Sequence, residues 1–192
     1  MSQKAVSKDN ALPIVTCHKV YYALKIESGY ETPVYMENLT EIGVEKNYNT
    51  EPFYAEGTLK YTESNLSDIP VTISQGDLLE KDEVALMGHK VDKNGLVVRN
   101  TNDIPATVAL MFTVKKAENI YKGYVFYDGK FVPTGVSAAT SEGSPNYQTK
   151  TITGNFKPLA NGDTDSSKIL TSEAEVEEFF AAVPIPVFTE VA

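Results

Sequence analysis

The stretch that decides the fold runs from Val71 to Val98 and reads VTISQGDLLEKDEVALMGHKVDKNGLVV. Its first residues alternate between apolar and polar side chains, which is typical of a strand with one buried face. Its last residues place Asn94-Gly95 between two apolar stretches, which predicts a hairpin with a type I′ turn. No catalytic motif lies in this stretch, so we expect it to build a scaffold.

The middle of the same stretch predicts one short helix whose start is open. A start at Leu78, with Asp77 as the cap, would put Asp82 inside the apolar stripe. A start near Glu83, with Asp82 as the cap, removes that conflict. In both cases Gly88 is expected to end the helix, because glycine adopts the left-handed conformation without steric cost.

Strand patterns fill the rest of the first 157 residues. The clearest alternation, Ala106–Val114, is expected to form the central core strand. Tyr121–Tyr127 and Lys130–Val132 are expected to form a hairpin around Asp128-Gly129. Other predicted strands are Val20–Ile26, Leu39–Lys46, Leu59–Ser64, Ile69–Ser74 and Tyr147–Phe156, the last of which is expected to be the final strand. About ten short strands with one helix favour a mainly β fold, a two-sheet β-sandwich or barrel.

Composition divides the chain into three parts. Residues 1–13 are polar and are expected to be an N-terminal arm. Residues 14–157 hold the strand patterns and form the β-sandwich domain. Residues 158–192 carry seven acidic residues and a single lysine, and are expected to be an acidic C-terminal extension. In that extension, 160–171 is linker-like, and a short helix capped by Ser172 follows.

One segment without any periodicity, Asn47–Gly57, is expected to be a long loop. Long loops in compact domains are uncommon unless they are functional. This one contains Tyr48, Phe53 and Tyr54, beside Glu51, and exposed aromatic residues of this kind usually mark a contact surface. The alternative is that the rings fold back onto their own domain. These four residues are the candidate self-assembly site.

The sequence contains little that could support catalysis or tight binding of a small molecule. His18 and His89 lie on different predicted elements, and Cys17 is the only cysteine, so we expect no catalytic residue, cofactor or metal site. Asn161–Ser166 resembles a calcium loop but lacks its spaced bidentate glutamate. With a net charge of −9, the chain has no basic face for gripping nucleic acid. It also has no apolar run long enough to span a membrane.

Several stretches, in order, resemble the major tail tube protein of long-tailed (siphovirus-type) bacteriophages that infect Gram-positive bacteria. The stretches are Val20–Leu24, Ala85–His89, Val91–Gly95, Tyr124–Phe131 and Tyr147–Phe156. The resemblance spans about residues 18–157, and residues beyond Pro158 lie outside it.

The resemblance implies a structural virion protein that self-assembles as hexameric rings, stacked into the tail tube. The tube would enclose a tape-measure protein, meet tail terminator and distal tail proteins, and conduct double-stranded DNA without binding it specifically. Assembly would take place in the host cytoplasm, with no membrane involved, and Asn47–Gly57 would cross to the neighbouring ring. The alternative is a small β-sandwich carbohydrate-binding or adhesive module that uses Tyr121, Tyr124 and Tyr127 as a sugar platform. Alternation places Tyr124 away from the other two rings, which argues against the alternative.

Overall fold

The structure is a computed structural model that describes residues 11–133, 135–136, 139–140 and 147–187. The N-terminal arm predicted over residues 1–13 therefore lies, up to residue 10, outside the described residues. The strands are β1 (Ile14–Ile26), β2 (Gly29–Tyr30), β3 (Val34–Met36), β4 (Leu39–Val44), β5 (Asn47–Ala55), β6 (Thr58–Gln75), β7 (Lys90–Val91), β8 (Val97–Val98), β9 (Val108–Lys116), β10 (Tyr121–Val132), β11 (Lys150–Lys157) and β12 (Asp165–Leu170). The helices are α1 (Glu80–Met87) and α2 (Glu173–Ala181), and η2 (Ala117–Asn119) is a 3-10 turn.

Ten of these strands form a single antiparallel sheet in the order β2-β1-β9-β10-β11-β6-β4. β3 pairs with β1, β12 with β10, and β5 with β6, while β7 and β8 form a separate ribbon. The mainly β prediction is confirmed, but the described strands do not divide into the two stacked sheets that were expected. The sheet bends instead, so that Ile42 and Val44 of β4 pack against the same core as Val20 and Phe112.

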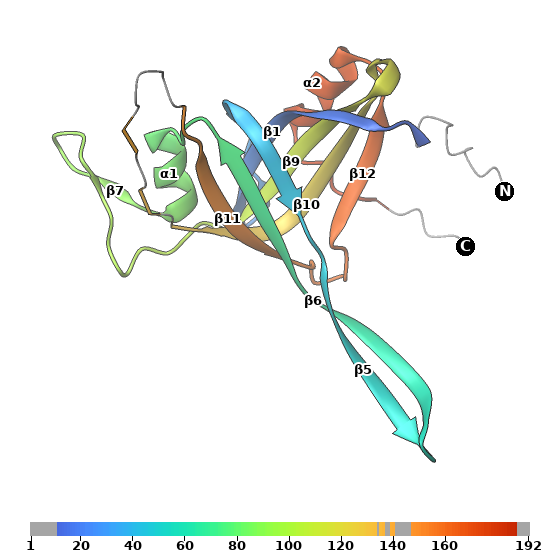
Figure 1. Cartoon of the computed structure of the whole chain (residues 1–192). Coiled ribbons are helices and arrows are strands. Elements are labelled where there is room, and N and C mark those ends of the chain that lie inside the picture. Colours follow the sequence, from blue (N-terminus) through green and yellow to red (C-terminus); the bar gives the residue numbers. More distant parts are fainter. Residues whose placement is uncertain (1–10, 134, 137–138, 141–146, 188–192) are drawn as a thin grey trace.

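The concave face of the bent sheet holds the main core. Alternate residues of β9, namely Val108, Leu110 and Phe112, point into this core, which also contains Leu86 and Met87 of α1. The predicted central position of β9 is confirmed, because β9 lies between β1 and β10 and is buried on both faces. Figure 1 shows α1 and α2 on different sides of the sheet.

The convex face carries a second core that α2 covers. Phe179 and Phe180 of α2 pack with Met111 and Tyr127 of the sheet. The predicted cap is confirmed, since the backbone N–H of Glu175 donates to the Ser172 hydroxyl at 3.3 Å. An N-terminal cap of this kind satisfies a helix donor that has no partner inside the helix.

The linker predicted over 160–171 is wrong for Asp165–Leu170, which forms β12. This strand pairs with Tyr121–Phe126 of β10, so Tyr147–Phe156 does not contain the final strand. β12 is an edge strand in which only Leu170 is deeply buried. Its main-chain hydrogen bonds hold it in place, and a polar edge sequence carries no periodic signal of that pairing.

The predicted turn at Asp128-Gly129 is also wrong, because β10 continues through both residues to Val132. A bulge lies between Phe126 and Gly129, where the register against β9 shifts. Gly129 faces Phe156 of β11, and a Cβ atom on it would lie 2.3 Å from the Phe156 ring. The glycine therefore allows a close approach of a ring rather than a change of direction.

α1 begins at Glu80, between the two starts that the sequence suggested, and it has no side-chain cap. The end at Gly88 is confirmed, with a φ of 72°. Asp82 is buried, and the Tyr22 hydroxyl donates to its carboxylate at 2.9 Å. Burial raises the pKa of Asp82 above its ordinary value. The apparent conflict in the apolar stripe is thus resolved by a buried hydrogen bond.

The hairpin predicted around Asn94-Gly95 is confirmed, but its type I′ turn is not. Val91 of β7 pairs with Val97 of β8. Gly95 has a φ of 85°, whereas Asn94 does not have a positive φ. The Asp92 carboxylate accepts the backbone N–H of Asn94 at 2.8 Å. This side-chain capping and the single left-handed glycine are typical of a hairpin loop longer than two residues, in which a bulge follows the turn.

Candidate assembly interface

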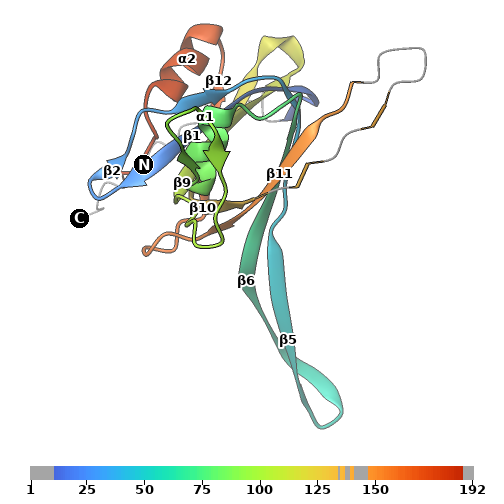
Figure 2. The same ribbon diagram turned by 90° about the vertical axis from the view of Figure 1, so that its left-hand side faces the viewer.

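The most exposed feature of the fold is a two-stranded hairpin that β5 and β6 form. Figures 1 and 2 show that it projects from the sheet as a long ribbon. The prediction that Asn47–Gly57 is a loop is therefore wrong. β5 pairs with β6 from Asn47 opposite Asp68 to Ala55 opposite Thr58. The strands predicted at Leu59–Ser64 and Ile69–Ser74 are parts of the continuous β6.

Two local features explain why the sequence pattern did not predict this hairpin. Its turn is Glu56-Gly57, with φ angles of 54° and 74°, which suits a type I′ turn without the usual Asn-Gly pair. Pro52 lies in the middle of β5, where proline usually argues against a strand. Among the described residues β5 pairs only with β6, so it is an edge strand that can accommodate proline.

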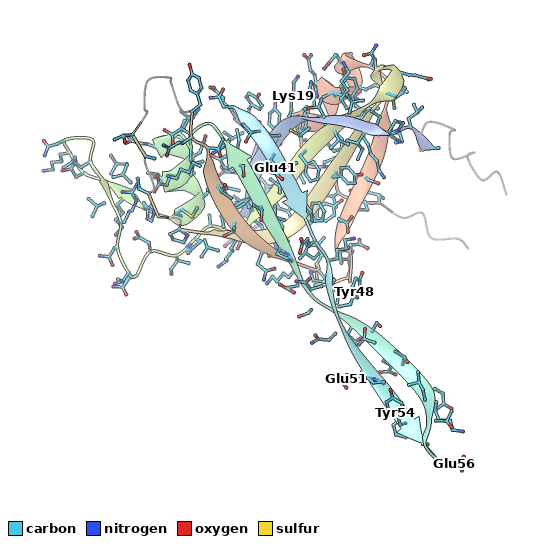
Figure 3. The ribbon with its side chains drawn as sticks, in the orientation of Figure 1. Lys19, Glu41, Tyr48, Glu51, Tyr54 and Glu56 are labelled. Atoms are coloured by element: carbon cyan, nitrogen blue, oxygen red, sulfur yellow. The ribbon has the colours of Figure 1, made fainter. Side chains whose placement is uncertain are left out.

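All four predicted site residues lie on β5, but they do not form one patch. Successive side chains of a strand point to opposite faces, so Glu51 and Phe53 share one face while Tyr48 and Tyr54 share the other. The three rings are between 57% and 64% exposed. They do not fold back onto the domain, and Figure 3 shows Tyr48, Glu51 and Tyr54 along the projecting ribbon.

The β6 half of this surface was not among the predicted site residues. Tyr61 lies opposite Phe53, with ring centroids 6.3 Å apart, and it is 71% exposed. Leu59 lies opposite Tyr54 and is half exposed. The sequence predicted a strand over Leu59–Ser64, and a strand pattern alone cannot distinguish a face covered by the domain from one left open.

Two carboxylates oppose each other on the face that carries Phe53. Glu51 pairs directly with Glu63 across the hairpin, and like charges in this position destabilise a strand pair. No ion pair to either glutamate is present in the described part of the chain. The hairpin face defined by Glu51, Phe53, Tyr61 and Glu63 is therefore both apolar and anionic.

The two histidines each contact a structural partner. The Nδ1 atom of His89 lies 2.7 Å from an Asp103 carboxylate oxygen in a buried pair. His18 contacts the Thr113 hydroxyl at 3.3 Å, and burial lowers the pKa of His18. Within the described ranges, no three His, Cys, Asp or Glu side chains are arranged to hold a metal ion.

The sugar platform of the alternative function is not formed. Tyr121 and Tyr127 are buried against α2 in the convex core. Tyr124 lies on the opposite face, where it stacks on Phe112 with ring centroids 5.0 Å apart. The three rings cannot bind one ligand together, because the sheet separates them.

The sheet projects a hairpin whose apolar side chains the other described residues leave uncovered. A family model described as phage tail tube protein matches residues 35–182. This match covers most of the chain, which therefore belongs to the phage tail tube protein family. The protein is a structural, non-enzymatic component of the virion, and its family membership implies homo-oligomeric assembly together with other tail proteins.

Among solved structures, the chain is similar to the cryo-EM structure of the anti-feeding prophage cap, described as a tube-terminating cap. The two share 14% sequence identity with a TM-score of 0.49, over 88% of this chain and 100% of that chain. No curated protein sequence matches the chain significantly. Neither of the two described helices has the length and apolar character needed to cross a membrane.

Proposed function

We propose that this chain forms the tail tube itself, as hexameric rings that stack along the tube axis. The observation that carries the proposal is the projecting β5–β6 hairpin, whose rings the parent domain leaves uncovered. Exposed apolar side chains of this density cost free energy in water unless a partner covers them. The hairpin with Tyr48, Glu51, Phe53 and Tyr54 crosses to the neighbouring ring.

The stacked rings enclose a tape-measure protein before infection and conduct double-stranded DNA afterwards. A net charge of −9 supports passage of DNA without specific binding, because phosphate groups are retained by basic faces. Tail terminator and distal tail proteins meet the two ends of the tube. The resemblance described above supports a siphovirus-type phage of a Gram-positive host, with assembly in the host cytoplasm.

Residues 158–192 lie on the outer side of the tube in this proposal, or shield the monomer from premature polymerisation. Support comes from α2, which covers the convex face of the sheet through Phe179 and Phe180. A face that its own chain already covers is not free to line a channel. Cutting the chain after Leu159 should therefore alter solubility or assembly, and a truncated chain unchanged in both would contradict this role.

The hairpin is tested by replacing Phe53 and Tyr54 together with serine. Both side chains are more than half exposed, so the unfolding free energy should change little, while rings and tubes should be lost from negative-stain images and light scattering. The matched control replaces Val91 and Leu96 with serine, because these residues are similarly exposed on the β7–β8 ribbon. Tubes of normal length from the Phe53/Tyr54 variant would refute the proposal.

A further inference from the structure

An apolar groove opens at the base of the projecting hairpin. Its apolar lining includes Ile14, Ile42, Val44, Phe112, Tyr124 and Phe126, the paired Lys46 and Asp165 also line it, and its volume is about 420 Å³. β4 forms one wall, while β9 and β10 form the floor, so the groove marks where the bent sheet fails to close. We call it the base groove. It is large enough for aromatic side chains, and no described segment fills it.

Two lysines and one carboxylate border the base groove, in a chain whose net charge is −9. Lys122 holds its amine 5.0 Å from the centre of the Tyr124 ring. Lys46 lies at the junction of β4 and β5 and pairs with Asp165 of β12 at 2.5 Å. The two lysines outnumber the one carboxylate that pairs with them, which leaves a net positive charge beside an apolar floor.

The hairpin face is the complement of this groove. Phe53 and Tyr61 form an aromatic pair near the tip of the hairpin. Glu51 and Glu63, the next pair on the same face toward the base, supply two carboxylates. The cross-strand repulsion between these glutamates would be relieved by an external cation. In a contact between the two surfaces, the aromatic pair would lie on the apolar floor of the groove and the two carboxylates would lie beside the lysines.

The base groove cannot receive the hairpin of its own chain. β5 has nine residues, which at about 3.4 Å per residue carry the tip roughly 30 Å from the base. Figures 1 and 2 show the ribbon leading away from the sheet in both views. A second copy must therefore supply the occupant.

We infer that the hairpin face of one copy docks in the base groove of the next copy along the tube. This inference rests on the proposed function and names the surface that receives the hairpin. Tip and base are two different surfaces, so the contact is heterologous, and because the tip lies far from the base of its own chain the contact can repeat from copy to copy along the tube. Such a contact explains stacking growth, whereas closure of each ring requires other surfaces.

A cysteine trap tests the contact directly. In a Cys17→Ser background, Tyr61→Cys is combined with Val44→Cys, and the assembled protein is oxidised. Linked copies should form a ladder on a denaturing gel, because each copy carries one tip and one groove cysteine. The matched control combines Tyr61→Cys with Val132→Cys, an exposed position on β10, and should give no ladder. Equal ladders from both pairs, or none from the groove pair, would overturn the inference.

A charge exchange provides the second test. E51K/E63K keeps like charges opposed within the hairpin but reverses the sign of its face. This variant and Lys122→Glu should each raise the protein concentration needed for tubes by roughly tenfold or more, since like charges then meet across the contact. The triple variant should recover most of the loss. No recovery would overturn the inference.

The two tests separate this inference from the proposed function. If the unmodified chain forms tubes but the groove cysteines do not link, the hairpin docks elsewhere and the inference fails alone. If the unmodified chain forms no rings or tubes under any condition, the proposed function fails and the inference falls with it.

Discussion

Replacing Gly129 with alanine should destabilise the fold strongly, although the substitution adds one methyl group. The new Cβ would lie 2.3 Å from Cδ1 of Phe156, far inside van der Waals contact. Phe156 is 1% exposed and is held edge-on between Phe126 and Phe131, at centroid distances of 6.1 and 5.9 Å. Its ring cannot move aside without disturbing the concave core.

The magnitude follows from two opposed effects. Overpacking a well-filled core typically costs about 1–3 kcal/mol. Removing a glycine from a strand returns roughly 0.5–1 kcal/mol. With contact this close, we expect a net loss of about 2 kcal/mol. Gly43 in β4 is the matched control, because a Cβ there would meet nothing within 4 Å, and Gly43→Ala should be neutral or slightly stabilising.

Urea unfolding of the two variants measures the difference. A loss of about 2 kcal/mol shifts the midpoint downward by roughly 1 M, for a slope near 2 kcal/mol/M. Adding Phe156→Leu to Gly129→Ala should cost less than the two single losses combined, because the smaller side chain makes room. If Gly129→Ala is as stable as Gly43→Ala, the close approach of the ring is not the reason for the glycine.

Two further predictions concern the edge and the convex face of the sheet. Burial, reinforced by Asp128, raises the pKa of Tyr30 to about 12. In the unfolded chain the same tyrosine has a pKa near 10 and therefore ionises first. The free energy of unfolding should fall as the pH rises from about 10 to 12, by at most about 2–3 kcal/mol. Tyr30→Phe should flatten this fall in pH-dependent urea unfolding, whereas Tyr147→Phe at a 92% exposed position should not; equal profiles would contradict the assignment. Phe180→Ala should cost about 3–5 kcal/mol, because Phe180 is 5% exposed and stacks on Tyr21 at 4.1 Å. A loss below about 1 kcal/mol in the same assay would mean that α2 does not stabilise the sheet.

Local chemistry determined several features that the sequence predicted correctly. The alternation in β9, the left-handed glycine that ends α1 and the Ser172 cap of α2 each depend on residues only a few positions apart. Their signals are therefore complete within a short window. The aromatic content of Asn47–Gly57 likewise pointed to the exposed segment, although the segment forms a strand and not a loop.

Tertiary structure alone decided the features that depend on partners distant in sequence. The sequence predicted a turn at Gly129. The actual reason for the glycine could not be seen there, because the ring that approaches it belongs to Phe156 on the neighbouring strand. β12 looked like a linker because its order comes from pairing with β10. Tyr61 belongs to the candidate site because its strand pairs with β5 and leaves the ring uncovered, and neither fact can be read from the residues around it. Periodicity indicates on which face of a strand a residue lies, whereas the path of the whole chain decides whether another segment packs against that face.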